Sequence, residues 1–253
     1  MKILILGLGW LGKDLALKLK QRNFDVIGTK RAVDEAETNI QQIAWNTEED
    51  LPDDLKTDIC IITLTPSAIL DLNKFEEHLN KLTINGVKRI IYTSSTGVYD
   101  GLENIVKEDS ELIISTDRQI KLVALENIIL KHKHSVILRL AGLVGDDRIP
   151  AKFLAGKKNV AGANQPINMI HKIDAINIIE LLITSQFEGI MNAVSSNHPT
   201  RKKYYTKLCD KFNLEKPEFN SEFEPVRIVS NELSKEILKY QYVVDDTLEY
   251  FIS

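Results

Sequence analysis

The chain of 253 residues carries 32 basic and 36 acidic side chains, which gives a formal net charge of -4. Its 43% of hydrophobic and 27% of charged residues are ordinary for a globular protein, and the slight acidic excess argues against a nucleic-acid partner. Two isolated cysteines, Cys60 and Cys209, provide neither a disulfide framework nor a zinc site, so we expect no metal and a reducing, cytoplasmic location.

The first twelve residues contain one lysine and a mostly apolar stretch, but they do not predict a membrane segment. No apolar run approaches the roughly 20 residues that span a bilayer. A signal peptide is the alternative, but Lys13 and Asp14 interrupt the stretch and glycines punctuate it. We therefore expect a buried strand followed by a turn, and no membrane partner.

Short apolar runs alternate with helical stretches through the first 145 residues. Leu11, Leu15 and Leu19 recur at helical spacing after the first run. Such alternation predicts an α/β protein with a doubly wound parallel sheet and helices on both faces. The expected strands cover residues 3–6, 24–27, 43–45, 59–62, 89–92 and 136–140, and two further helices cover 68–82 and 118–130.

The pattern changes after residue 145. We expect helices at 172–185 and 201–212, strands at 189–194 and 226–229, and a last helix to residue 239 with Ser230 as its N-cap. No second complete series of strands and helices follows. The prediction is a core over residues 1–145 and a smaller α/β lobe over residues 146–253, which covers the substrate side and is not an independent domain.

A glycine motif lies directly between the first strand and the first helix. Gly7 permits a tight turn, Gly9 lets a pyrophosphate approach the backbone, and Gly12 lets the helix pack closely. The helix N-terminus then offers amide groups and a positive dipole end to phosphates. We predict a Rossmann-type NAD(P) site that includes Trp10 and Leu11. The alternative is a glycine turn without a ligand.

Two cations follow the second strand, where the choice between NAD and NADP is usually made. An acidic residue there suits a ribose hydroxyl, and a basic residue suits a 2′-phosphate. The chain has Thr29, Lys30 and Arg31 at this position, and its first acid comes later, at Asp34. These three residues predict cofactor contacts and favour NADP, with NAD as the alternative. Solvated loop charges are the other interpretation of the two cations.

Four segments in order then carry a family resemblance. Residues 92–100 read YTSSTGVYD and resemble the YTSSxxVYG signature of extended short-chain dehydrogenase/reductases, the NAD-dependent epimerase/dehydratase superfamily. Residues 138–145 resemble its RxxGxYGP segment, residues 168–174 its NxIHxxD segment, and residues 191–194 its YNV strand. A polar turn with satisfied hydroxyls is the alternative reading of the first segment.

The resemblance is that of an atypical member. The glycine turn is GxGxxG where extended members usually have GxxGxxG. More importantly, no tyrosine is followed by lysine four residues later, although family members typically use Tyr-x-x-x-Lys for proton transfer. Arg118 and Leu122 fall at those two positions.

The resemblance also implies roles for particular residues. Ser95 would hold the substrate oxygen, Tyr99 would be a relocated acid/base, and Arg118 would supply a cation, which makes these three the candidate catalytic residues. Arginine stays protonated and cannot be an ordinary acid/base. The implied cofactor contacts at the ends of the fourth and fifth strands are Thr63, Leu64, Thr65 and Ser94.

The expected function is that of an NAD(P)-dependent oxidoreductase or epimerase acting on a small polar, sugar-like substrate. The alternative, favoured by the missing tyrosine–lysine pair, is a non-catalytic dinucleotide-binding or redox-sensing protein. The resemblance further implies a homodimer formed through the helices at 68–82 and 118–130. Leu122, Leu125 and Ile129 would serve either that interface or the core.

Overall fold

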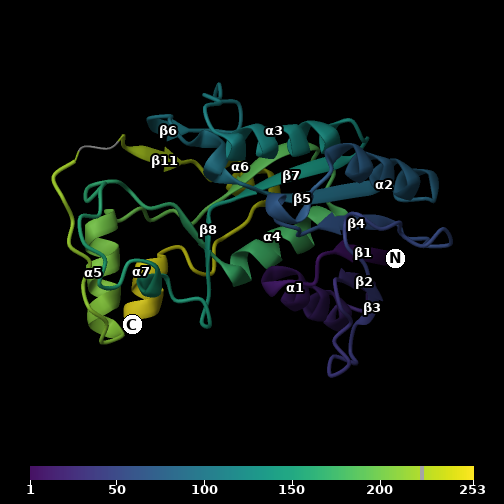
Figure 1. Cartoon of the computed structure of the whole chain (residues 1–253), viewed down its shortest axis with the longest axis horizontal. Coiled ribbons are helices and arrows are strands. Elements are labelled where there is room, and N and C mark those ends of the chain that lie inside the picture. The colour runs from purple at the N-terminus through teal and green to yellow at the C-terminus, as the bar shows by residue number, and fades with distance from the viewer. Residues whose placement is uncertain (223–224) are drawn as a thin grey trace. The chain divides into compact units, whose positions relative to one another are not determined.

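The structure, a computed structural model, describes residues 1–222 and 225–253 (Figure 1). Over these residues the main sheet has seven strands in the order β10-β7-β5-β4-β1-β2-β3, and two small sheets pair β6 with β11 and β8 with β9. The bounds of the strands are β1 Lys2–Leu6, β2 Asp25–Lys30, β3 Gln41–Ala44, β4 Ile59–Ile62, β5 Arg89–Ser95, β6 Asn104–Val106, β7 Ser135–Leu140, β8 Gly142–Val144, β9 Met169–His171, β10 Gly189–Ala193 and β11 Arg227–Val229.

The order of the main sheet confirms the predicted doubly wound α/β fold. Strands β1 and β2, β2 and β3, β1 and β4, and β4 and β5 pair in parallel. The chain builds outward from β1 in one direction through β2 and β3, and then returns to β4 on the other side. The switch between β1 and β4 is where such sheets bind ligands, outside the carboxyl ends of the strands.

In the part of the chain that the structure describes, seven helices accompany these strands: α1 Trp10–Gln21, α2 Leu72–Ile84, α3 Asp117–Leu130, α4 Lys172–Thr184, α5 Arg201–Lys211, α6 Glu232–Leu238 and α7 Thr247–Ile252. Figure 1 shows α2 and α3 together over one face of the sheet and α1 on the other. Glu180 of α4 pairs with Lys18 and Arg22 of α1, so the C-terminal half of α4 lies beside α1.

The described chain forms two compact units that interleave in sequence. The first consists of residues 1–95, 116–139 and 179–191, and the second of residues 96–115, 140–178 and 192–253. The sequence predicts a single division at residue 145. The units follow another pattern because the chain leaves the first unit after β5 and re-enters it for α3, and later for the end of α4 and most of β10.

Each unit has its own apolar core. In the first, strands β1, β4 and β5 and helices α2 and α3 enclose fully buried side chains such as Leu4, Ile62 and Phe75. In the second, helices α5 and α7 pack around Tyr204, Leu208 and other apolar residues. No helix among the described residues is long and apolar enough to cross a membrane.

Side-chain caps explain where several helices begin. Asp71 accepts backbone hydrogen bonds at the start of α2, and Thr116 does so at the start of α3. The helix expected from residue 68 therefore begins only at Leu72, after a short 3₁₀ turn at Pro66–Ala68. The N-cap of α6 is Asn231 and not Ser230, although the Ser230 hydroxyl accepts a hydrogen bond from the Glu232 amide.

Three apolar residues of α3 belong to the interior of the first unit. Leu122, Leu125 and Ile129 are at most 1% exposed, and the last two pack in the core between α3 and the sheet. They serve the core and are not available to a dimer interface. The homodimer itself stays a prediction.

Candidate functional site

A cleft of about 860 Å³ opens in the first unit beside the carboxyl ends of β1, β2, β3 and β4. Its volume is in the range of sites for ligands of small to medium size. The residues that line it are Gly7, Leu8, Gly9, Thr29, Lys30, Arg31, Ala32, Trp45, Asn46, Thr47, Glu48, Thr63, Leu64, Thr65, Ser67, Ala68 and Leu70. The fold thus brings together eight of the twelve residues that the sequence proposes for cofactor binding.

The glycine turn is shaped by close approaches that only glycine permits. Gly7 has a φ of +105°, which residues with a side chain rarely adopt. A Cβ on Gly12 would lie 2.1 Å from the Gly7 carbonyl oxygen and 2.6 Å from the Thr63 hydroxyl. Gly12 is therefore buried in the contact between α1 and the turn, and it does not line the cleft.

Gly9 is different, because a Cβ there would meet nothing within 4 Å. It is the N-cap of α1 and lines the cleft. Among the described residues no side chain caps this helix by a hydrogen bond, in contrast to α2 and α3, and its first turn has no acid. The open space in front of Gly9 and the positive end of the helix fit the pyrophosphate of a dinucleotide.

Trp10 and Leu11 lie in the first turn of α1 behind the cleft. Leu11 is buried and Trp10 is half-buried, and neither side chain lines the cleft. Their contribution to a cofactor site would come through the backbone of the helix. Both stay predictions.

The two cations at the end of β2, Lys30 within the strand and Arg31 directly after it, have different surroundings. The Lys30 ammonium lies 3.1 Å from a carboxylate oxygen of Asp34, and this hydrogen bond lowers the pKa of the Asp34 carboxyl. The Asp34 loop is itself held by Gln42, which accepts from its amide and donates to its carbonyl. No described residue forms an ion pair with Arg31, which is exposed on the rim of the cleft. Arg31 is thus the cation that is available to an anionic ligand.

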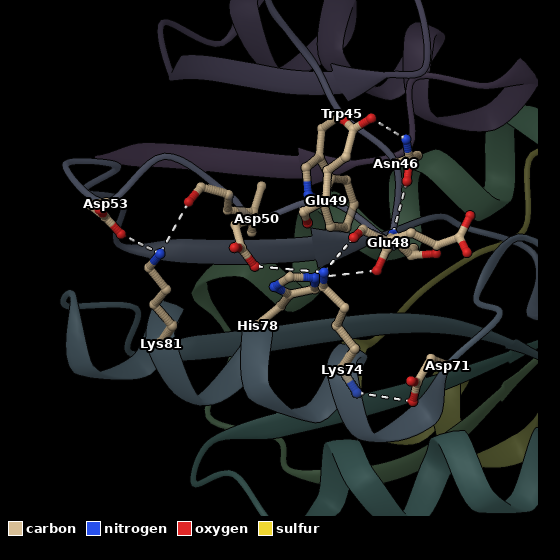
Figure 2. A network of polar contacts seen from close by, with 12 residues as sticks. Trp45, Asn46, Glu48, Glu49, Asp50, Asp53, Asp71, Lys74, His78 and Lys81 are labelled. Carbon is tan, nitrogen blue, oxygen red and sulfur yellow. Dashed lines mark hydrogen bonds and ion pairs between the residues drawn. The ribbon is translucent and has the colours of Figure 1, made fainter.

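One wall of the cleft is a segment that follows β3, residues 45–48. Figure 2 shows this segment tied to α2. The Trp45 indole donates to the Glu49 carbonyl and meets the His78 ring edge-on at 5.5 Å. His78 Nε2 is 3.3 Å from the Thr47 carbonyl, and burial lowers the pKa of His78, so a neutral ring with its hydrogen on Nε2 suits this contact.

Further contacts hold the same wall. The Thr47 hydroxyl donates to the Ala68 carbonyl at 2.9 Å, and the Lys74 ammonium donates to the Glu48 carbonyl. Lys81 binds the Leu51 carbonyl a little farther along. The wall is therefore fixed mainly through backbone carbonyls. Asn46 and Glu48 also line the cleft, and the Asn46 side chain donates to the Glu49 carboxylate and accepts from the Glu48 amide.

Ser94 is placed away from the cleft. Its buried hydroxyl donates to Glu126 of α3 at 2.5 Å. Glu126 also pairs with Arg139 of β7 through contacts of 2.7 to 3.3 Å, and both side chains are 3% exposed. This buried cluster joins β5, α3 and β7, so the structure gives Ser94 a supporting position.

The three candidate catalytic residues have unequal exposure. Ser95 is half-buried at the end of β5, and Arg118 is exposed in the first turn of α3. Leu122, at the position of the family lysine, is 1% exposed. Tyr99 is completely buried, and its hydroxyl donates to the Asn192 side chain at 2.9 Å. These residues keep their proposed roles only as predictions, and Tyr99 would first have to release Asn192.

The second unit has a smaller cleft of about 410 Å³, lined by Asp100, Gly101, Leu102, Gln165, Pro166, Asn168, Pro225 and Arg227. Arg227 is its cation and pairs with Asp100 at 2.7 Å. Asn168 lies at the start of the NxIHxxD segment and bonds the backbone of β11, accepting from Val229 and donating to the Arg227 carbonyl.

His171 and Asp174, in the same segment, are buried and make contacts that hold the fold together. Burial lowers the pKa of His171, whose ring lies against Tyr250 with centroids 4.6 Å apart. Asp174 is fully buried and accepts from the Tyr240 hydroxyl and from the amides of Val243 and Val244. The carboxylate therefore anchors the segment that leads to α7.

The sequence reasoning missed the wall at residues 45–48 and the lining residues Ser67, Ala68 and Leu70. The usable signal was topological. In a sheet that continues from β1 to β2 and β3, whatever follows β3 lies at the same edge as the glycine turn. The apolar pattern of β3 is weak, so the sequence does not predict that the residues after it line the cleft.

The comparisons with known proteins agree with this architecture. No family model matches the chain. It is 34% identical to Protein YeeZ of Escherichia coli K12 over 242 residues, which cover 88% of each chain. A protein from Methylobacillus flagellatus described as an NAD-dependent epimerase/dehydratase has a TM-score of 0.81 at 21% identity, with 98% of this chain and 95% of that chain covered.

The structure of MoeE5 with UDP-glucose and NAD has a TM-score of 0.82 at 14% identity, with coverage of 99% of this chain and 96% of that chain. These likenesses extend over both units and show a shared fold. The chain belongs to the same family as Protein YeeZ of Escherichia coli, and its fold is that of the NAD-dependent epimerase/dehydratase group of short-chain dehydrogenase/reductases.

Proposed function

We propose that the chain binds NADP in the cleft of the first unit and reduces, oxidises or epimerises a small polar substrate of the sugar-nucleotide class. The observation that carries the proposal is the open space in front of Gly9 at the uncapped start of α1, within a cleft of suitable volume. The nicotinamide would supply hydride transfer. The residues of this chain would bind the dinucleotide and orient the substrate.

Each part of the cleft fits one part of the dinucleotide. The amides at the start of α1 suit the pyrophosphate, and Arg31 at the end of β2 suits a 2′-phosphate. Leu64 and Thr65, which follow β4, lie where a ribose would meet the edge of the sheet. The wall at residues 45–48 closes the opposite side.

The preference for NADP depends mainly on Arg31. Arg31→Ala is expected to weaken NADPH binding by about tenfold, because it removes a charge-assisted hydrogen bond, and to leave NADH binding nearly unchanged. Lys30→Ala should have a smaller effect, since Lys30 is paired with Asp34. Asp34→Asn, which releases Lys30, should strengthen NADPH binding.

Fluorescence titrations of the four proteins with both dinucleotides would test this assignment. Equal losses for NADPH and NADH in Arg31→Ala would contradict a 2′-phosphate contact. An unchanged NADPH affinity in Asp34→Asn would mean that Lys30 points away from the ligand even when it is unpaired.

For the substrate, the support comes from the fold. MoeE5, which shares the fold, binds UDP-glucose. We propose that Ser95 holds the reacting oxygen and that Arg118 orients a polar group of the substrate.

A second candidate function is dinucleotide binding without catalysis. It is favoured by the buried Leu122 where the family has lysine and by the buried Tyr99 hydroxyl. Following NADPH absorbance with a panel of keto-sugar nucleotides, for the native protein and Ser95→Ala, separates the two. Turnover that Ser95→Ala abolishes supports the enzyme, whereas tight NADPH binding without turnover across the panel supports the binding protein.

A further inference from the structure

We propose that Thr29 and Thr63 are positioning residues, which hold the Gly7 peptide from opposite sides and thereby fix the turn that faces the phosphates. This inference rests on the proposed dinucleotide site and assigns these two residues a role other than direct contact with the ligand. We name the pair the Gly7 clamp.

The first arm of the clamp comes from β2. The Thr29 hydroxyl accepts a hydrogen bond from the Gly7 amide at 3.0 Å. The Thr29 carbonyl accepts another from the Leu8 amide at 2.7 Å. Because Thr29 is only 1% exposed, both bonds are shielded from water.

The second arm comes from Thr63, the residue directly after β4, on the other side of β1. The Thr63 hydroxyl donates to the Gly7 carbonyl at 2.6 Å. The same hydroxyl lies 2.6 Å from where a Cβ on Gly12 would stand, so it also contacts the first turn of α1. Thr63 therefore fixes both the carbonyl of the turn and the approach of the helix.

The two arms have opposite hydrogen-bonding polarity. One hydroxyl accepts from the amide of Gly7 and the other donates to its carbonyl, so both polar groups of one residue are satisfied by side chains of the neighbouring strands. Gly7 has a φ of +105° and could populate many other conformations if it were released. Holding this residue in one conformation before the ligand arrives lowers the cost of binding.

The test compares valine and serine at each position. Thr29→Val and Thr63→Val keep the β-branched shape and remove the hydroxyl, and Thr29→Ser and Thr63→Ser keep the hydroxyl. The matched control is Thr93→Val, which removes the bond from the Thr93 hydroxyl to the Ile62 carbonyl, a comparable bond at 3.1 Å between neighbouring strands.

We expect each valine variant to raise the dissociation constant of NADPH by about tenfold and each serine variant by no more than about twofold. The loss should be the same for NADH, because the clamp acts on the turn and not on the 2′-phosphate. Valine variants that fold and bind as the native protein does would overturn the proposal, as would serine variants that are as weak as the valine variants.

Hydrogen exchange of the ligand-free protein provides a second readout. The Gly7 amide should exchange about tenfold faster or more in Thr29→Val than in the native protein, Thr29→Ser or Thr93→Val. If the native protein binds neither dinucleotide, the proposed function fails, and this exchange rate still decides on the clamp. Equal Gly7 exchange in Thr29→Val and the native protein would refute it whatever the ligand is.

Discussion

Replacing Glu126 by alanine is expected to lower the free energy of unfolding by about 3–5 kcal/mol. The substitution leaves the Arg139 guanidinium 3% exposed without its carboxylate partner, and it removes the acceptor of the Ser94 hydroxyl. Removing the carboxylate from a buried ion pair is among the most destabilising changes to a fold. Urea unfolding followed by circular dichroism measures the effect.

A double variant provides the control for this prediction. Glu126→Leu together with Arg139→Met removes both charges and keeps similar volumes, so it should recover most of the lost stability. A loss below about 1 kcal/mol for Glu126→Ala would mean that water reaches Arg139 and that the cluster is not sealed as the structure has it.

The substitutions Gly12→Ala and Gly9→Ala should have opposite consequences, although both add one methyl group to the same motif. Gly12→Ala forces a carbon to within 2.1 Å of the Gly7 carbonyl oxygen, so either α1 or the turn must move. We expect a loss of about 3 kcal/mol in the free energy of unfolding. Gly9→Ala meets open space and should change stability by no more than about 0.5 kcal/mol.

For NADPH binding, Gly9→Ala is the informative variant, because it should weaken binding without lowering stability. The methyl group of Gly9→Ala projects into the space that the pyrophosphate would occupy, so we expect at least about tenfold weaker binding of NADPH by a protein of native stability. Thermal unfolding and fluorescence titration measure the two properties separately. A stable Gly9→Ala variant with native affinity would remove the pyrophosphate from this position.

Much of this architecture is visible in the sequence, because the local patterns and the topology agree. The buried residues 3–6 of β1 form an uninterrupted apolar run, and the glycines at residues 7, 9 and 12 occupy the turn after it and the first turn of α1. The spacing of Leu11, Leu15 and Leu19 gives the buried stripe of α1. These features depend on neighbours in the chain, so sequence patterns capture them.

Contacts between distant segments are what the sequence does not predict. A serine at the end of a strand can face a cleft or a neighbouring helix, and only the packing of α3 directs Ser94 to Glu126. Lys30 and Arg31 are adjacent in sequence and both are cations. In the structure Asp34 pairs with Lys30, and Arg31 stays on the rim of the cleft. The role of a side chain at such an edge depends on which partner the tertiary structure brings to it.

The most direct test of the central claim is a titration of the purified protein with NADPH and NADH, repeated with Arg31→Ala. The proposed site predicts that both dinucleotides bind, that NADPH binds more tightly, and that Arg31→Ala removes most of the difference. Binding of neither dinucleotide at sub-millimolar concentration would contradict the claim and leave the cleft at the edge of the sheet to a different ligand.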